Sequence, residues 1–448
     1  MRIRQISAMA LALTGAVFAA AWVQAQNLTA AQLPPLTLVQ AAPLTLAQAL
    51  AGARNNVDVA LARSAAAAAQ ADVLAADHAP FPTLSAKLSS IDLQNGIGGG
   101  SLLGDKRIDK GIGLDWTYER GNKRGLRTQA AQRSASAAQA DLQDTQIQQL
   151  LAASNAFFDL SAAQERVTQV AANAAGTAQI ASTAARRVSA GDLARQDLLR
   201  LEIEAERAKG DVLSATLERQ RAALALASLL GATVGPAQSL QTQPDWPAVA
   251  TPGDAPMDIA ATGGAVSAWV DARPDVRAAA ERVQAARAVL DGSHALKKAD
   301  VTWGVSFDHF PGTSTRQLEL RLQLPLQFGY QYQGETGRAQ ALLTAAQDAL
   351  DKARRAATLD FQGLAAQLQN GALRSRSYQQ DILPRAAKVA EQAEFAYTKG
   401  ALSLNDLLDA RRTLRTTGLE ALAARSDHAK AATAWHLRTQ PVAALLAE

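Results

Sequence analysis

Four segments in which apolar and polar residues alternate constrain this chain more than any other feature. They come in pairs, one at about 83–120 and the other at about 300–329. Between Leu318 and Phe328, every second residue is apolar and its neighbours are polar or proline. A period of two is that of a β-strand, whose side chains point alternately to the two faces of a sheet. We therefore predict two β-hairpins, each with one apolar and one polar face.

Each segment has the length of a strand that crosses a membrane. Tilted strands of about 9–11 residues span a bilayer, with apolar residues toward lipid and polar residues toward the lumen. A half-buried sheet in a soluble domain would show the same alternation. Four segments behind an export signal favour the barrel. On this interpretation Asp115, Glu119, Glu319 and Arg321 face the lumen, where they either tune conductance or only keep the wall wet.

Residues 1–25 are typical of a secretory signal peptide. Arg2 and Arg4 precede an apolar stretch, and Val23-Gln24-Ala25 is a small-residue cleavage site. An uncleaved anchor helix is the less favoured alternative, because the apolar core is short and rich in alanine. Removal leaves 43 Lys+Arg (45 minus the two arginines) against 41 Asp+Glu, a balance that argues against nucleic-acid binding. Since no later segment has 18 consecutive apolar residues, no membrane-spanning helix is expected.

The chain offers little for catalysis or metal binding. It has no cysteine, so we expect no disulfide, no thiolate site and no lipid anchor on an N-terminal cysteine. Its 5 histidines do not cluster at ligand spacing, and no nucleophile, phosphate-loop or dinucleotide motif is present. We therefore expect no enzyme activity, no catalytic residue, no cofactor and no dedicated metal site.

Very long helices follow the predicted hairpins. The stretch 122–188 contains no proline, and as a helix it would extend roughly 100 Å at ~1.5 Å per residue. Another long helical stretch, from Glu335 to about Tyr397, is interrupted by Pro384. Such lengths favour coiled-coil or repeat packing.

The order of elements occurs twice, which predicts a tandem repeat. The residues around Gly191 reappear around Gly400, 209 positions later, and each half reads helix, two strands, very long helix, turn and helix. The predicted organisation is a signal peptide (1–25), an extended arm (26–43), a first repeat (44–231, turn at 189–193), a proline-rich connector (232–274), a second repeat (275–440, turn at 398–403) and a tail (441–448).

Four strands are too few to close a barrel. Open strand edges do not persist in hydrocarbon, so several chains must contribute strands to one barrel. Two chains would supply eight strands around a filled interior. Three chains would supply twelve and leave room for water.

Several motifs resemble those of a known family. The stretch from Leu383 to Arg412, "LPRAAKVAEQAEFAYTKGALSLNDLLDARR", resembles the second-repeat signature of the TolC-like outer-membrane efflux family. "YERGNKRGLRTQAA" (118–131) and "YQGETGRAQA" (332–341) are similar to motifs of its cobalt–zinc–cadmium (CzcC-type) heavy-metal branch, although Asn122 stands where that branch has a glycine. The resemblance covers essentially the whole chain after the signal peptide.

The resemblance implies a mixed α+β membrane protein, mainly α, that forms a homotrimer. Four strands per chain would make a 12-stranded transmembrane β-barrel in outer-membrane lipid, above a long α-helical barrel in the periplasm. The implied partners are a periplasmic adaptor protein and an inner-membrane pump of the resistance-nodulation-division type. The implied function is an exit duct for divalent heavy-metal cations. The alternatives are a duct for a multidrug pump or, in a different class, a periplasmic coiled-coil adaptor or scaffold.

The resemblance also implies a pore constriction at the periplasmic end. Asp406 and Asp409 match acids that line this mouth in the family, and three copies would form a ring of six carboxylates that attracts cations. The plain alternative is a solvated helix start, where acids are favoured by the helix dipole.

The turns near this mouth carry the remaining expected sites. Asp197 and Tyr397 match positions whose inter-helix hydrogen bonds hold the tip closed in the family, although Leu402 replaces the family's arginine partner. Local capping and packing is the alternative for both. Gly191 and Gly400 follow helix ends and suit left-handed caps in turns expected to meet the adaptor.

Overall fold

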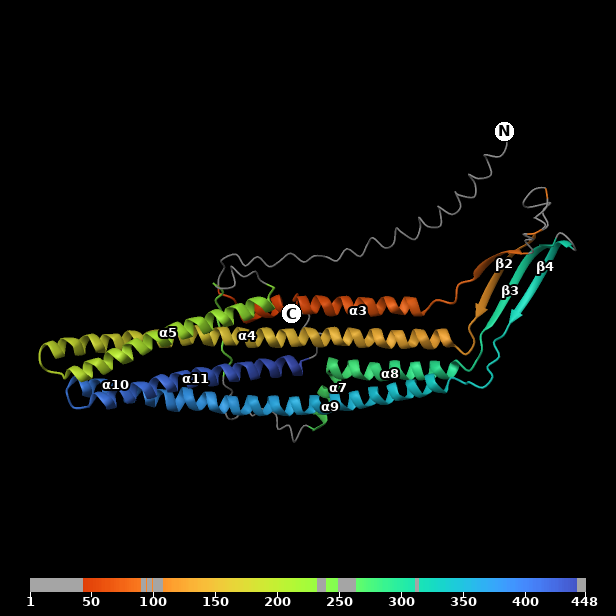
Figure 1. The fold of residues 1–448 in the computed structure, drawn as a ribbon. Coiled ribbons are helices and arrows are strands. Elements are labelled where there is room, and N and C mark those ends of the chain that lie inside the picture. The colour runs from red at the N-terminus through yellow and green to blue at the C-terminus, as the bar shows by residue number, and fades with distance from the viewer. Residues whose placement is uncertain are drawn as a thin grey trace. The chain divides into compact units, whose positions relative to one another are not determined.

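The computed structural model describes residues 43–89, 94, 99, 108–231, 239–248, 263–310 and 314–440. The predicted signal peptide, the arm up to residue 42, the tail 441–448 and much of the connector lie outside the described residues. Within the described part, long helices lie side by side and lead at one end into a single four-stranded sheet (Figure 1).

The first repeat begins with two helices where the sequence predicted one. They are α2 (Leu46–Ala53) and α3 (Val57–Ala76), divided at Asn56, whose side chain accepts a hydrogen bond of 2.9 Å from the backbone N–H of Asp58. An asparagine at this position caps a new helix instead of continuing the old one. The repeat continues with β1 (Thr83–Ser89), β2 (Asp109–Tyr118), α4 (Lys123–Ser189) and α5 (Arg195–Leu229).

One helical stretch is a departure from the expectation that no segment could span a membrane as a helix. Among the described residues, Leu46–Ala76 is long and apolar enough by length and composition alone. Its hydropathy comes largely from alanine, and Asn56 divides it into two helices. Because α3 also packs lengthwise along α4, we assign it to the helical layer (Figure 1).

The second repeat follows this order and also starts with two helices, the first of which was not predicted. That helix, α7 (Gly263–Ala272), lies within the stretch predicted to be an irregular connector, so the prediction was wrong there. Its end is set by Pro274, which occupies the first turn of the next helix, where its missing N–H costs nothing. The remaining elements are α8 (Pro274–Ala295), β3 (Val301–Phe310), β4 (Ser314–Gln323), α9 (Gln333–Arg376), a π-helical segment (Ser377–Ile382), α10 (Leu383–Thr398) and α11 (Leu404–Thr439).

The last strand is shorter than predicted. The alternation continues to Phe328, but β4 ends at Gln323, two residues before Pro325. Proline has no N–H for the ladder, so the strand stops although the side-chain pattern goes on. Leu326 and Phe328 therefore lie in the connection to α9, where both are exposed.

The second long α-helix is divided beside Pro384, as predicted, but the chain stays helical across the division. The preceding six residues, Ser377–Ile382, form π-helical turns, and α10 begins directly after them with Pro384 in its first turn. The chain stays helical through this point because the π-helical turns accommodate the missing N–H and the ring.

The helices form one layer around α4. In the half near the sheet α4 lies between α3 and α8, and in the other half between α5 and α11; α9 lies beyond α8 and α11 (Figure 1). The turn between α4 and α5 and the turn between α10 and α11 both lie at the end of the layer opposite the sheet (Figure 1). We call these two turns the tips.

The strand-to-helix junctions explain the departure from the glycine motif. The residue that precedes α4 is Asn122 with φ 59°, and the residue that precedes α9 is Tyr332, also with φ 59°. Asparagine adopts this left-handed conformation at little cost. Asn122 therefore serves the purpose that a glycine would serve, and "GNKRG" keeps its backbone geometry.

Alanines form most of the core between helices, which allows close helix packing. One cluster joins α7, α8, α9 and α11, where Phe361 is fully buried beside Val276 and packs against Trp269 and Trp435. Near the tips a second cluster joins both repeats, with Leu201 of α5 and Leu404 of α11 buried together.

Candidate functional site

The sheet presents one continuous apolar face to its surroundings. The strands pair antiparallel in the order β1-β2-β3-β4, and the register places Leu84, Leu114, Val305 and Leu320 in one row across all four. These side chains stay exposed; Leu320, for example, is 75% exposed. A soluble domain would cover such a face, because each exposed leucine forgoes about 1.5–3 kcal/mol of burial. The face therefore fits lipid.

Most aromatic side chains of this face lie toward the helical end, whereas Phe307 lies nearer the other end of β3. Trp116 pairs directly with Trp303 across β2 and β3, and both are about 60% exposed. Tyr118 lies two residues after Trp116 on β2, on the same face of the sheet. Amphipathic rings are favoured where hydrocarbon meets water, so this end of the strands fits a membrane boundary.

On the polar face, charged side chains lie over glycines. Arg321 of β4 bonds Asp115 of β2 at 2.6 Å across the intervening strand, and both lie over Gly304 of β3. A Cβ on Gly304 would come within 2.5 Å of the Asp115 carboxylate. Asp308 covers Gly111 in the same way, at 2.0 Å. The charges thus lie flat against the wall instead of pointing away from it.

The predicted lumen-facing residues separate into two groups. Asp115, Glu319 and Arg321 share the polar face, with Glu319 3.9 Å from Arg321. Glu119 follows the end of β2 and bonds Arg127 of α4 at 3.1 Å. It fixes the strand-to-helix junction and is not part of a strand. That Gly111 and Gly304 make room for these charged side chains was not predicted from the sequence. The placement of glycines among polar residues on the same strands could have indicated it.

Both tips end their helices in the same way. Gly191 has φ 85° and Gly400 has φ 73°, which confirms the predicted left-handed caps. The next residue in each turn donates to a carbonyl five positions back: Asp192 to Arg187 at 2.8 Å and Ala401 to Ala396 at 2.9 Å. Nothing lies within 4 Å of a Cβ at either glycine, so each turn is open to a partner.

Asp406 and Asp409 are exposed in the first turns of α11. Ser403 caps this helix: its hydroxyl accepts from the Asp406 N–H at 3.3 Å and donates to the Asp406 carboxylate at 2.7 Å. Asp406 thus has a capping role, whereas Asp409 has none. Both line a groove of about 580 Å³ between α5 and α11. Its other charged residues are Arg200, Glu204, Arg207 and Arg412, so three arginines face three carboxylates.

Asp197 and Tyr397 do not form a lock within one chain. Asp197 lies half-buried in the first turn of α5, and no hydrogen bond joins it to Tyr397 in the described part of the chain. The Tyr397 ring packs into the tip clusters, with the Arg187 guanidinium 5.8 Å from its centre. Its hydroxyl is buried and has no hydrogen-bond partner among the described residues. Leu402, in the place of the family's arginine, packs against the same cluster.

Sequence reasoning missed a series of ion pairs between the repeats. Where α11 meets the first repeat, the basic partner is on α11 and the acidic partner on α4 or α5, as in Arg415 with Asp211 at 2.7 Å and Arg425 with Glu165. Arg412 pairs with Glu204 and Lys430 with Asp159 in the same sense. The partners are more than 200 positions apart, so no local spacing reveals them.

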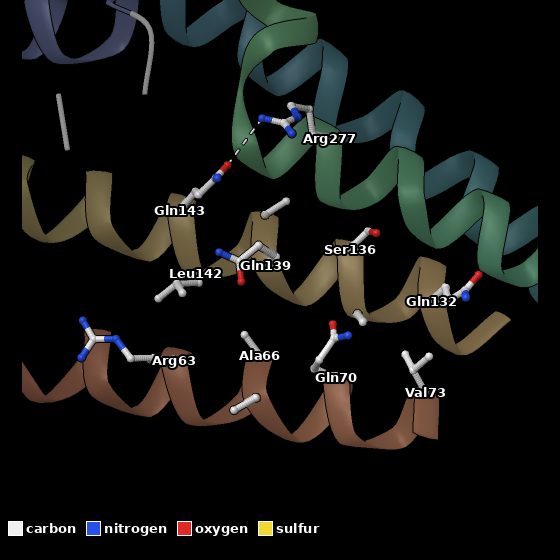
Figure 2. A pocket seen from close by; sticks show the side chains of 13 residues that line it. Arg63, Ala66, Gln70, Val73, Gln132, Ser136, Gln139, Leu142, Gln143 and Arg277 are labelled. Atoms are coloured by element: carbon white, nitrogen blue, oxygen red, sulfur yellow. Dashed lines mark hydrogen bonds between the residues drawn. The ribbon is translucent and has the colours of Figure 1, made fainter. Parts of the chain in front are cut away.

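A groove of about 640 Å³ runs over α4 between α3 and α8 (Figure 2). Its polar side chains are amides, one hydroxyl and two arginines; Arg277 donates to Gln143 at 3.4 Å. The polar lining consists of Arg63, Gln70, Gln132, Ser136, Gln139, Gln143 and Arg277. With no carboxylate in the lining it does not suit a cation. Across the described residues, no group of three or more His, Cys, Asp or Glu side chains is arranged to hold a metal ion.

Comparisons with known proteins agree with this geometry. The family model described as "Outer membrane efflux protein" matches residues 20–232. The cobalt-zinc-cadmium resistance protein CzcC of Cupriavidus metallidurans is 25% identical over 296 residues, covering 66% of this chain and 68% of CzcC.

Solved structures share the fold. The outer membrane protein VceC of Vibrio cholerae superposes with a TM-score of 0.73 at 16% identity, over 89% of this chain and 96% of VceC. CusC, described by its transmembrane channel formation, superposes with a TM-score of 0.67 at 17% identity, over 90% of this chain and 95% of CusC. The lipid-suited sheet, the paired repeats and these matches agree on an outer-membrane efflux channel, and the first repeat is similar to the outer membrane efflux protein family.

Proposed function

We propose that three copies of this chain form the outer-membrane exit duct of a tripartite efflux system. The observation that carries this is the four-stranded sheet, whose outer strands β1 and β4 have no neighbouring strand among the described residues while its apolar face is exposed. Hydrocarbon does not tolerate open edges, so β1 of one copy must pair with β4 of the next. Twelve strands then enclose a water-filled lumen.

Exposed apolar residues on the two outer sides of the helical layer also favour a closed ring of three copies. On α5, exposed apolar residues recur at coiled-coil spacing, as in Leu199, Ile203, Leu213 and Leu217. On the opposite side, α9, α10 and the π-helical segment between them expose Leu373, Ile382, Val389 and Phe395. A head-to-tail ring brings these two sides together in a periplasmic helical tube.

The chain's lack of cysteine makes the trimer straightforward to test. Ile203→Cys together with Val389→Cys places one thiol on each outer side, at similar distances along the helices from Gly191 and Gly400. Oxidation is expected to give covalent dimers and trimers on a denaturing gel, and each single variant is expected to stop at dimers or monomers. A chain that stays monomeric in outer-membrane extracts, by crosslinking and by mass, would exclude the ring.

The proposed cargo is divalent heavy-metal cations. Two observations support it: the similarity to CzcC, named for cobalt, zinc and cadmium resistance, and the "GNKRG" junction with its left-handed Asn122. Since no described cluster would trap a metal ion, the duct passes cations without holding them. Energy for export comes from an inner-membrane pump of the resistance-nodulation-division type, to which a periplasmic adaptor protein links the tips around Gly191 and Gly400.

Growth of a deletion strain tests the cargo. The strain is compared with wild type on zinc, cobalt, cadmium, nickel and copper, and on a panel of dyes and detergents. Sensitivity to metals alone is expected. Sensitivity to dyes and detergents alone would assign the duct to a multidrug pump instead.

We further propose that Asp406 and Asp409 line the periplasmic mouth and attract cations. Asp406→Asn with Asp409→Asn removes six carboxylates from a trimer. In planar bilayers we expect a several-fold loss of cation-over-anion selectivity at low salt that disappears at high salt, because screening removes such fields. Asp427→Asn, on the same helix but well away from the tip, is the matched control. Unchanged selectivity in the double variant would leave Asp406 with its capping role alone and Asp409 as an ordinary solvated residue of the helix start.

A further inference from the structure

A second cavity lies between the two repeats, well above the tips. It is a half-open cavity of about 370 Å³, bounded by α4, α10 and α11. Apolar side chains from all three helices line it, among them Val170, Leu383, Leu414 and Leu419. A mostly apolar cavity of this size, with a few polar groups, has the character of a small-molecule site.

Two glycines on facing helices leave this space open. Gly176 of α4 and Gly418 of α11 both line the cavity. A Cβ on Gly418 would meet only the Gln169 side chain, at an ordinary contact distance of 3.5 Å. The backbone there can therefore carry a side chain, and a larger one would extend into the cavity.

The cavity contains one charged donor whose hydrogen bonds are incomplete. The Nε and Nη2 atoms of Arg411 lie 2.7 Å from one carboxylate oxygen of Glu394. The Nη1 atom is buried and bonds no atom among the described residues. The guanidinium lies against Gly176, with Nη2 3.2 Å and Nη1 3.4 Å from the position of a Cβ. A buried N–H of a charged group that bonds nothing is costly, so an acceptor placed beside Nη1 is favoured.

The other charged residues that line the cavity are already paired. Arg415 bonds Asp211 of α5 at 2.7 Å, and Glu394 is held by Arg411. The one lining carboxylate, Glu394, is thus partly neutralised, whereas the Nη1 atom of Arg411 still lacks an acceptor. The chemistry of the cavity is therefore opposite to that of the proposed cargo.

We propose that this cavity binds a small amphiphilic anion, an aromatic or short-chain carboxylate. Its apolar body packs against Val170, Leu414 and Leu419, and its carboxylate accepts a hydrogen bond from Nη1 of Arg411. The ligand touches α4 on one side and α10 and α11 on the other. The ligand thus holds α10 and α11 of the second repeat against α4 of the first repeat. It favours the packed arrangement described here over any arrangement in which these helices separate.

Three probes that share one body and differ in head group test the site. They are 1-naphthoate, 1-naphthalenemethanol and 1-naphthylmethylammonium, added to the full channel in nanodiscs, with binding followed by naphthalene fluorescence and equilibrium dialysis. We expect 1-naphthoate to bind at least about tenfold more tightly than the alcohol or the ammonium ion, because only the carboxylate matches a charged donor. Equal binding of all three would reduce the cavity to a non-specific apolar void and overturn the proposal.

Variants of the lining residues locate the binding. Arg411→Gln is expected to weaken 1-naphthoate about tenfold, whereas Arg415→Gln, one turn away and already paired with Asp211, should change it less than twofold. Gly418→Leu fills the cavity and should abolish binding; Val170→Phe does the same from the opposite helix if the first variant folds poorly. Binding that survives Arg411→Gln, or no binding of 1-naphthoate at millimolar concentration, would overturn the proposal and assign Nη1 to a water molecule. None of these readouts depends on export, so they are independent of the cargo.

Discussion

The two repeats share one order of elements but differ in the helix that leads to the tip. In the first repeat α4 runs without a break from Lys123 to Ser189. In the second, the same path is divided into α9, the π-helical segment Ser377–Ile382 and α10. Segments of this kind mark points where a helix can adjust. The two helical pairs that reach the tips therefore differ in regularity: one contains an unbroken α-helix, and the other contains a π-helical segment of the kind often found at functional sites.

The strongest test of this difference transfers the proline. Ala175 of α4 lies 209 positions before Pro384, and it is exposed, so Ala175→Pro changes little besides the backbone. Without a π-helical segment before it, the ring should cost about 3 kcal/mol or more of helix stability. Thermal unfolding followed by circular dichroism measures the loss. Pro384→Ala is the matched reverse change and is expected to be neutral or stabilising; an equal loss in both variants would remove the distinction between the repeats.

Replacing the tip glycine by alanine should destabilise the two repeats by the same, smaller amount. Gly191→Ala and Gly400→Ala each place a side chain at positive φ, where nothing lies within 4 Å. Each should cost about 1–2 kcal/mol through backbone strain alone. Hydrogen exchange at the tip amides is the measurement. A cost at Gly400 well above that at Gly191 would mean that the two tips differ in more than their helices.

The helix starts beside the tips differ by one hydroxyl. Ser403 caps α11, whereas Ala194 stands at the same position of α5 and provides no side-chain cap. Ser403→Ala should lose about 1 kcal/mol, and Ala194→Ser should gain several tenths of a kcal/mol. Local hydrogen exchange in the first turn of each helix checks both. If Ala194→Ser brings no gain, the start of α5 has another source of stability.

One contact between the repeats should depend on pH. Burial, with a contribution from nearby Asp275, raises the pKa of Asp144 on α4; Arg438 of α11 lies 4.0 Å away and only partly opposes this. The folded state then binds this proton more tightly than the unfolded state, so stability from this group falls as pH rises through the raised pKa. Asp144→Asn should therefore gain stability relative to wild type between mildly acid and neutral pH, measured by urea unfolding. A relative loss over the same range would mean that the ion pair outweighs the burial.

The sequence predicted best what depends on local periodicity. The alternation around Leu320 and Val305 predicted four strands with opposite faces, and the glycines at 191 and 400 predicted the ends of α4 and α10. Proline was a weaker guide. Pro325 ended β4 earlier than the side-chain pattern suggested, and Pro384 allowed the helix to continue, because each outcome depends on the hydrogen bonds of the neighbouring backbone.

Contacts between distant residues were beyond local prediction. The ion pair of Arg425 with Glu165 joins residues 260 positions apart, and its partners are known only once the helices are side by side. The same holds for Arg411, whose place beside Gly176 depends on how α11 packs against α4. For Asp197 and Tyr397, the residue types were suitable for a hydrogen bond, but the packing of the tyrosine ring left none within one chain.

The open edges of β1 and β4 bear on how such a channel can be made. A single copy placed in hydrocarbon would expose two rows of backbone N–H and C=O groups, each of which costs several kcal/mol. In the proposed trimer, a lone copy is excluded from the lipid until neighbouring strands are available, so we expect insertion and assembly to occur as one event. A partly assembled wall would then not settle in the outer membrane and leave a leak.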